Sequence, residues 1–226
     1  MPQTAPVAPP TLMEGDCLTS EEFMRCWEEM PDVKHAELID GIVYMPSPLS
    51  LGHGRFESVL NTWLGIYAFG TPGCMPSLEA TWLMGGSDVP QPDITLTVLP
   101  ERGGQSGVEG IYHSGAPELI VEVAVSSYSR DFGVKKRLYE RMGVHEYLIA
   151  LPGKSQLVWF GLAPAGFQAL EPGTDGIFRS VCFPGLWLDP DALWNLDFAR
   201  VNNVLQQGLA TPAHAEFAAQ LAARKS

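Results

Sequence analysis

The sequence has few cysteines and no long apolar run, and both shortages narrow the class of protein. Its four cysteines are scattered over 226 residues, without a Cys-x-x-Cys pair or the Cys/His spacing of a zinc site. This usage favours free thiols in a reducing cytoplasm. No apolar stretch approaches the roughly 20 residues that span a membrane. The first residues also lack the basic and apolar regions of a signal peptide. We therefore expect a cytoplasmic protein with no membrane partner.

Basic residues are also scarce. The chain has 14 lysines and arginines against 26 aspartates and glutamates, which gives a net charge of −12. A general electrostatic attraction to nucleic acid is therefore absent. The basic residues are unevenly spread, since five of the 14 fall within twelve positions, at Arg130, Lys135, Lys136, Arg137 and Arg141. This cluster fits either a solvated helix face or a patch that faces phosphate.

Length and composition are those of one globular domain. Hydrophobic residues make up 46% of the chain, and its mean hydropathy is +0.03. This content is enough for a sizeable core. We see no internal repeat and no linker that divides the chain. The predicted layout is a disordered proline-rich tail over 1–17, one domain over 18–200 and a C-terminal helical extension over 201–226.

The predicted secondary structure runs helix, hairpin, helix, and then strands that alternate with helices. Thr19 can cap a helix over 20–29, because its hydroxyl can accept from the free amides at the helix start. Asp40-Gly41 between two apolar runs predicts a hairpin over 36–45. The other expected helices are 51–69, 134–142, 189–198 and 201–223, a loop is expected over 101–115, and the expected strands are 78–84, 93–98, 119–125, 146–150, 156–160, 167–170 and 178–182, the last two extending the sheet. This order predicts an α/β (α+β) fold.

A carboxylate in the middle of an apolar strand is the first functional clue. Residues 119–125 read as a buried strand, because they are rich in β-branched side chains and bounded by turn formers. Leu119, Val121, Val123 and Val125 then share one face, and Glu118, Ile120, Glu122 and Ala124 the other. A buried Glu122 would be costly unless it is paired, protonated or bound to a cation.

The second clue is a lysine within an apolar helix stripe. At about 100° per residue, Lys135 shares a face with Val134, Leu138 and Tyr139, whereas Lys136 looks outward. A strand carboxylate followed by an inward lysine predicts a polar site beneath the helix. The alternative is a snorkelling lysine, with its stem on the core and its head in water.

Three further polar residues are candidates for the same site. Asp93 starts a strand after Pro92, which suits the first position of a strand. Glu37 lies on the first arm of the hairpin, where a solvent-facing glutamate is the plainer interpretation. His53 lies in the first turn of a helix, where a capping or structural role is the plainer one. Two carboxylates from neighbouring strands, Asp93 and Glu122, can hold an oxygen-preferring divalent cation such as magnesium or manganese.

The order of these motifs resembles a known family. LTSEEF, AELIDGIVYMPSP, the His53 helix, VPQPDITL, GAPELIVEV and RDFGVKKRLYERMGVHEYLI follow one another as in the Uma-type (Uma-two) family of bacterial endonucleases. That family lies within the PD-(D/E)XK, or restriction-endonuclease-like, superfamily. The resemblance covers roughly 18–160. It implies a restriction-endonuclease-like core, in which a mixed central β-sheet is flanked by helices, with an N-terminal helix and hairpin and with C-terminal helices.

The resemblance also implies roles for single residues. Asp93 and Glu122 match the acidic pair that binds Mg²⁺ or Mn²⁺, and we assign Val123 to the same metal site. Lys135 matches the family's lysine, which lies on the helix because Ala124 stands where the superfamily motif has its lysine. Glu37 and His53 match further polar positions that bind metal or orient water, and Gln91 also fits. The apolar Ala124-Val125 departs from many relatives, which have polar residues there.

The implied function is a metal-dependent endonuclease that hydrolyses phosphodiester bonds, with the two carboxylates holding Mg²⁺ or Mn²⁺ and the lysine assisting water attack. DNA is the expected substrate, and a homodimer is a possible assembly. Two alternatives stay open. The first is an interaction or regulatory protein that keeps the fold without cleavage, which the net charge of −12 would favour. The second is hydrolysis of a smaller phosphate ester, which needs no affinity for bulk DNA.

Overall fold

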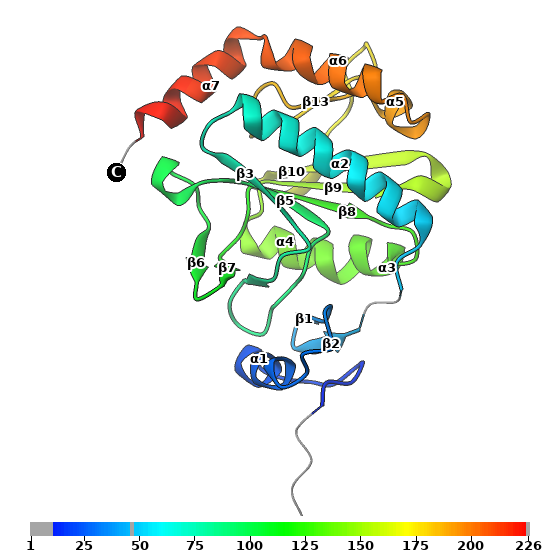
Figure 1. Ribbon diagram of the computed structural model, residues 1–226, viewed down its shortest axis with the longest axis vertical. Helices are drawn as coiled ribbons and strands as arrows, with labels where there is room; N and C mark the ends of the chain where they lie inside the picture. The colour runs from blue at the N-terminus through cyan, green and yellow to red at the C-terminus, as the bar shows by residue number, and fades with distance from the viewer. Residues whose placement is uncertain (1–10, 46–47, 225–226) are drawn as a thin grey trace, which may run out of the picture.

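A six-stranded mixed sheet forms the centre of the computed structural model, which describes residues 11–45 and 48–224 (Figure 1). The strand order is β11-β10-β9-β8-β5-β3. The pair β8–β9 is parallel and the other neighbours are antiparallel. The bounds of these strands are β3 Cys74–Leu78, β5 Ile94–Val98, β8 Leu119–Val123, β9 Glu146–Leu151, β10 Gln156–Ala163 and β11 Gly166–Ala169.

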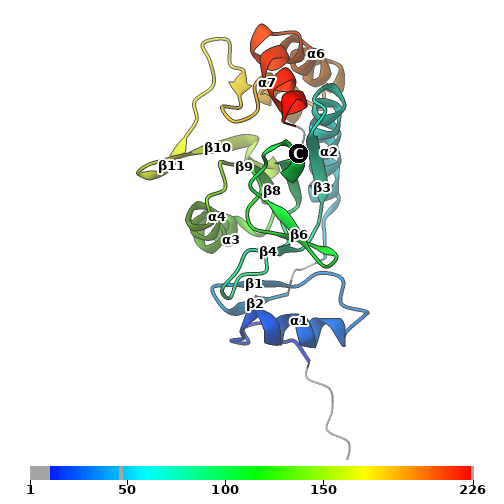
Figure 2. The same cartoon turned by 90° about the vertical axis from the view of Figure 1, so that its left-hand side faces the viewer.

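The sheet separates two apolar cores, and β8 contributes to both. Leu119, Val121 and Val123 pack with α2 (Leu51–Gly70) and the C-terminal helices, whereas Ile120 and Ala124 pack with α4 (Lys136–Met142). Figures 1 and 2 show α2 and α4 on opposite faces of the sheet. The predicted alternation is therefore confirmed over Leu119–Val123, but the strand ends there, two residues before the predicted end, and Val125 is 47% exposed instead of sharing the buried face. A strand that is covered on both faces has no solvent-facing side, so any polar side chain on it lies in the interior.

The N-terminal part forms a small unit below the sheet, made of α1 (Ser20–Glu28) and the hairpin β1 (Glu37–Ile39) and β2 (Ile42–Tyr44) (Figure 2). Thr19 caps α1 as predicted, and with Glu22 it forms a capping box. Asp40 and Gly41 have φ of 51° and 77°, the left-handed pair that a two-residue hairpin turn requires.

The tail prediction was wrong for its last residues. Residues 1–10 lie outside the described residues, but 11–17 pack on the hairpin. Leu12 is buried, and the Gly15 amide donates to the carbonyl oxygen of Val43. Burial of an apolar side chain and a paired backbone amide hold this segment in place.

The segment after β8 is helical in three steps. It runs through α3 (Tyr128–Arg130), a single π-helical stretch (Asp131–Lys135) and α4. A π-turn carries one more residue than an α-turn, so it rotates the side chains that follow. Lys135 is its last residue, and Gly143 ends α4 in the left-handed conformation.

Several elements differ from the prediction. The strand expected over 78–84 is two strands, β3 and β4 (Trp82–Leu83), separated at Glu79, which has a φ of 47°. The expected loop 101–115 contains the hairpin β6 (Gly107–Glu109) and β7 (Tyr112–Ser114), and β7 pairs with β4. The strand expected over 178–182 shortens to β12 (Phe178–Arg179) and pairs with β13 (Trp187–Leu188) outside the main sheet. The pairing of β4 with β7 joins segments that are distant in sequence, which local patterns do not specify.

The C-terminal helices cover the α2 side of the sheet. They are α5 (Pro190–Trp194), α6 (Phe198–Leu209) and α7 (Pro212–Ala223), and short 3₁₀ turns lie at Pro100–Arg102 and Pro152–Lys154. The single helix expected over 201–223 is two helices, because Thr211 caps α7 and Pro212 begins it. The boundary predicted at 201 falls inside α6, and Val201 and Leu205 belong to the main core. Among the described residues, none of the helices has the length and apolarity to cross a membrane.

Candidate functional site

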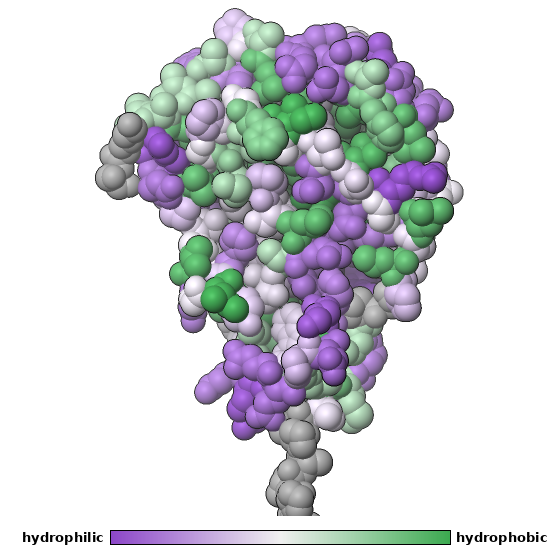
Figure 3. Space-filling model, viewed as in Figure 1, coloured by the Kyte–Doolittle hydropathy of each residue, from purple (hydrophilic) through white to green (hydrophobic). Residues whose placement is uncertain are grey.

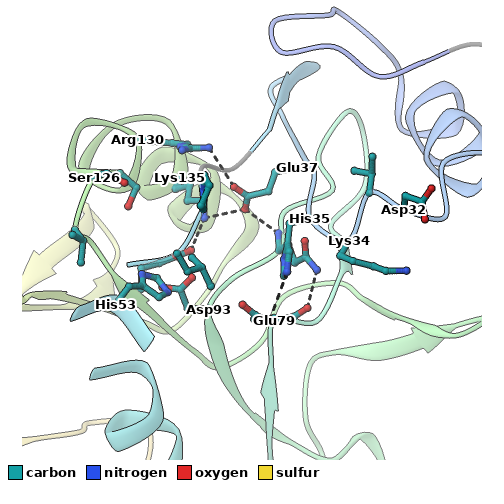
Figure 4. Close-up of a pocket in the computed structure, with 17 residues that line it drawn as sticks. Asp32, Lys34, His35, Glu37, His53, Glu79, Asp93, Ser126, Arg130 and Lys135 are labelled. Carbon is teal, nitrogen blue, oxygen red and sulfur yellow. Dashed lines mark hydrogen bonds and ion pairs between the residues drawn. The ribbon is translucent and has the colours of Figure 1, made fainter. Parts of the chain in front are cut away.

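A pocket of about 450 Å³ lies where the N-terminal hairpin meets the sheet, the start of α2 and α3 (Figure 4). All five predicted catalytic residues line it, namely Glu37, His53, Asp93, Glu122 and Lys135. Four of them lie on four different helices and strands, and Asp93 lies directly before β5; these segments are distant in sequence. The fold therefore brings together the residues that the sequence could only propose one by one.

Glu122, Lys135 and Glu37 form a buried ionic group. The Lys135 Nζ lies 2.8 Å from Glu122 Oε1 and 2.9 Å from Glu37 Oε1. The Tyr139 hydroxyl donates to the same Glu122 oxygen at 2.9 Å. The Lys135 side chain is only 6% exposed, which rules out snorkelling into water. The predicted inward lysine is confirmed, and the solvent-facing interpretation of Glu37 was wrong.

Electrostatics set the charge of this group. Burial raises the pKa of Glu122 to about 7, although the charge of Lys135 lowers it. Burial alone would lower the pKa of Lys135, but the charges of Glu122, Glu37 and Asp131 outweigh burial and raise it. Lys135 therefore stays protonated near neutral pH and acts as a fixed cation rather than as a proton acceptor.

Asp93 lies directly before β5, where Gln91-Pro92 lead into the strand. Its Oδ2 accepts from the Val123 amide at 2.6 Å, which ties it to the strand that carries Glu122. Burial and the Glu122 charge raise the pKa of Asp93 well above its usual value. Gln91 helps to hold the neighbouring Glu37, because its backbone amide donates to Glu37 Oε1 at 3.0 Å. A carboxyl that is buried close to a second acid favours a shared cation.

A second set of ligand-type atoms is built around Asp93. The Nε2 of His53 lies 3.6 Å from Asp93 Oδ2 and 3.7 Å from Glu57 Oε2. One ligand atom from each of the three residues lies within 4.8 Å of the others. In the described part of the chain, His53 Nε2 and Glu57 Oε1 are buried and without a hydrogen-bond partner. Buried polar atoms are costly when unpaired, so this pair points to a missing partner.

Glu57 was missed by sequence reasoning. Burial, followed by the charge of Glu79, raises its pKa to about 7. Burial lowers the pKa of His53, although its hydrogen bond to the Val123 backbone acts against burial. The signal was present, because a histidine and a glutamate four residues apart face the same side of a helix. Glu57 is a carboxylate within an apolar stripe of α2, just as Glu122 is a carboxylate within an apolar strand.

Asp131 was also missed. It is fully buried in the π-helical stretch, and burial raises its pKa despite the nearby Lys135 charge. Its Oδ2 accepts from the Ser127 hydroxyl, and within the described residues its Oδ1 has no partner. Asp131 is the first residue of the π-helical stretch, which the sequence analysis did not predict, so no sequence signal singled out this aspartate.

The available donors suit a hard divalent cation. Carboxylate oxygens are the ligands that magnesium and manganese prefer, and an imidazole nitrogen beside them suits manganese better than magnesium. None of the described residues that line the pocket is a cysteine. The orphaned atoms His53 Nε2 and Glu57 Oε1 are the observation on which this fit rests. The predicted ligands Asp93, Glu122 and Val123 lie together, although Glu122 Oε1 is engaged by Lys135 and Tyr139.

This fold and site define a protein of the restriction-endonuclease-like class, with a mixed sheet flanked by helices and an acidic pocket that holds a lysine. The comparisons with known proteins agree. A family model described as "Uma2: Putative restriction endonuclease" matches residues 20–191. The chain belongs to this family.

One similar solved structure is the crystal structure described as "a putative nuclease belonging to DUF820" from Anabaena variabilis. It is 16% identical to this chain, with a TM-score of 0.61, and the match covers 79% of this chain and 98% of that one. At this identity the likeness supports the fold alone. No curated protein sequence matches the chain.

Proposed function

We propose that this chain is a metal-dependent endonuclease that hydrolyses phosphodiester bonds, with DNA as the substrate. The observation that carries the proposal is the convergence of Asp93, Glu122 and Lys135 in one pocket, beside the orphaned atoms of His53 and Glu57. The family match supports a nuclease in general terms. The metal, the DNA and the role of the lysine are our extension.

Asp93 and Glu122 would hold the metal, with His53 and Glu57 completing its ligands and the Val123 backbone alongside. When bound, a divalent ion supplies Lewis acidity toward the phosphoryl oxygen and lowers the pKa of water. The three carboxylates suit Mg²⁺ or Mn²⁺, and the imidazole favours Mn²⁺ of the two. Glu57 is the addition that the structure makes to the sequence-based set.

Lys135 would stabilise the negative charge that develops on the phosphate. Its raised pKa keeps it protonated, and a preorganised cation in a buried site stabilises such charge strongly. Glu37 would keep the lysine in place, since it accepts from Nζ at 2.9 Å and is itself fixed by the Gln91 amide. The Tyr139 hydroxyl likewise would keep Glu122 in place, since it donates to Glu122 Oε1.

The two alternatives make different demands on this pocket. A scaffold without activity would have no reason to keep buried ligand-type atoms unpartnered. A hydrolase of a smaller phosphate ester would use the same centre without binding DNA. An excess of negative charge in the pocket opposes the binding of a polyanion such as DNA and to that extent favours the smaller ester. The pocket has five carboxylates, Asp32, Glu37, Glu79, Asp93 and Glu122, against three permanent cations, Lys34, Arg130 and Lys135.

Titration calorimetry with Mg²⁺ and Mn²⁺ tests the proposal, with plasmid nicking followed in the same buffers. Wild type should bind and nick, and Asp93→Ala should lose both while it stays folded. Asp32→Asn, which changes an acid of the same pocket outside the ligand group, should keep both. Metal binding without cleavage of either plasmid or a single-stranded DNA would favour the smaller ester, and no binding at all would favour the inactive scaffold.

A further inference from the structure

The mouth of this polar pocket carries exposed apolar side chains. Leu49 and Val125 line the pocket and are 55% and 47% exposed. Leu51, at 80%, begins α2, and Tyr128, at 45%, follows the lining residues Ser126 and Ser127. Figure 3 shows green patches where α2 begins. Large apolar side chains exposed together beside a site mark a binding surface.

The rim also holds an aromatic ring in a fixed position. Phe132 stacks on Tyr128 with ring centroids 4.6 Å apart and an interplanar angle of 30°. The Lys154 Nζ lies 4.2 Å from the centroid of the Tyr128 ring. The ring is thus supported by Phe132 and carries the Lys154 ammonium over it, so a nucleobase that stacks on Tyr128 would displace Lys154 from the ring.

Cations lie along the other parts of the pocket wall. Figure 4 shows Lys34 and His35 away from Ser126, and Arg130 above Glu37. The Arg130 guanidinium lies 3.8 Å from Glu37 Oε2 and 5.3 Å from the centre of the Tyr44 ring. The pocket therefore has apolar side chains at its mouth and the cations Lys34, Arg130 and Lys135 in its wall, of which Arg130 and Lys135 are paired with Glu37.

The charge of the whole chain limits how much phosphate it can bind. Duplex binding draws most of its affinity from neutralising many phosphates, and this chain carries a net charge of −12. A cavity of about 450 Å³ lies in the range of sites that enclose one small ligand, about 300–1,000 Å³. It can take a nucleotide unit, whereas a continuous duplex would only cross its mouth.

We propose that the apolar rim, formed by Leu49, Leu51, Val125 and Tyr128, holds unpaired nucleobases, so that the substrate is a single-stranded segment of DNA. This inference rests on the proposed nuclease function and narrows its substrate. Base contacts through apolar and aromatic surface supply affinity that does not depend on a strongly basic protein. They also favour a strand whose bases are already unstacked.

Fluorescence anisotropy in Ca²⁺ tests the inference, with a labelled single strand and a duplex of the same sequence. The full chain should bind the single strand at least tenfold more tightly. Tyr128→Ala should weaken single-strand binding by about fivefold or more, and Val125→Ser and Leu49→Ser should weaken it in the same direction. Ile111→Ser is the matched control, because Ile111 is 87% exposed and does not line the pocket.

Equal or tighter binding of the duplex would overturn the inference, as would rim variants that behave like Ile111→Ser. Each variant is first compared with wild type by thermal unfolding, and Leu49 and Val125 provide two independent rim segments. Failure of the inference differs from failure of the proposed function. If wild type binds Mg²⁺ and nicks plasmid while the rim variants change nothing, only the inference fails. If neither metal binding nor cleavage of either DNA occurs, the nuclease proposal itself fails.

Discussion

Replacing Lys135 with methionine tests the electrostatics of the site through stability. Lys135→Met keeps most of the side-chain volume and removes the cation shared by Glu122 and Glu37. Removing one partner of a buried ion pair typically costs about 3–5 kcal/mol, because a buried charge is left uncompensated. Protonation of the Glu122 carboxyl reduces that cost in the variant.

The pH dependence follows from the pKa of Glu122. In wild type, burial already raises it from 4.5 to about 7, a shift that corresponds to about 3 kcal/mol at roughly 1.4 kcal/mol per unit. A raised pKa favours the folded state below the unfolded value and loses that contribution as pH rises through the folded one. Lys135 lowers the pKa of Glu122, so its removal raises that pKa further and deepens the loss above pH 7.

We therefore expect Lys135→Met to lose about 3–5 kcal/mol of unfolding free energy at pH 8 and clearly less at pH 5. Urea unfolding at both pH values measures the difference. Lys135→Met combined with Glu122→Gln should recover stability at pH 8, because the uncompensated charge is gone. Lys136→Met, whose Nζ lies 4.4 Å from the centre of the Phe160 ring, should lose only about 1 kcal/mol at either pH. An equal loss for Lys135→Met at pH 5 and pH 8 would refute the reasoning.

Three further predictions concern other residues. Glu57→Gln should weaken Mn²⁺ binding at least tenfold in calorimetry while the fold persists, and unchanged binding would remove Glu57 from the ligand set. Glu146→Ala should lower the free energy of unfolding in urea by about 3 kcal/mol or more, because the Glu146 carboxylate accepts from Trp159, Ser180 and the Cys182 amide. A loss below about 1 kcal/mol would show that water replaces the carboxylate. Thr19→Ala should cost about 1 kcal/mol by the same measurement, since it breaks the cap of α1, and no change would mean that α1 contributes nothing to global stability.

The sequence predicted the elements whose signals are local. The Asp40-Gly41 turn, the Thr19 cap and the alternation of β8 each depend on residues close together in the chain. Burial on both faces of β8 explains why Glu122 stood out as an anomaly. The helical-wheel position of Lys135 was predicted for the same reason, because periodicity reports which face is covered.

The parts that the sequence did not predict depend on distant partners. The pairing of β4 with β7 is set by tertiary contacts, and so is the burial of Glu37. Glu57 became a candidate only when α2 was placed beside Asp93. The metal, the DNA substrate and the homodimer stay predictions.

Anomalous diffraction from crystals soaked in Mn²⁺ tests the central claim most directly, because it locates the ion without reference to activity. The account predicts an anomalous peak in the pocket, in contact with Asp93 and bridging to His53 or Glu122, and its loss in Asp93→Ala. A peak elsewhere on the protein, or an empty pocket at saturating Mn²⁺, would contradict the account.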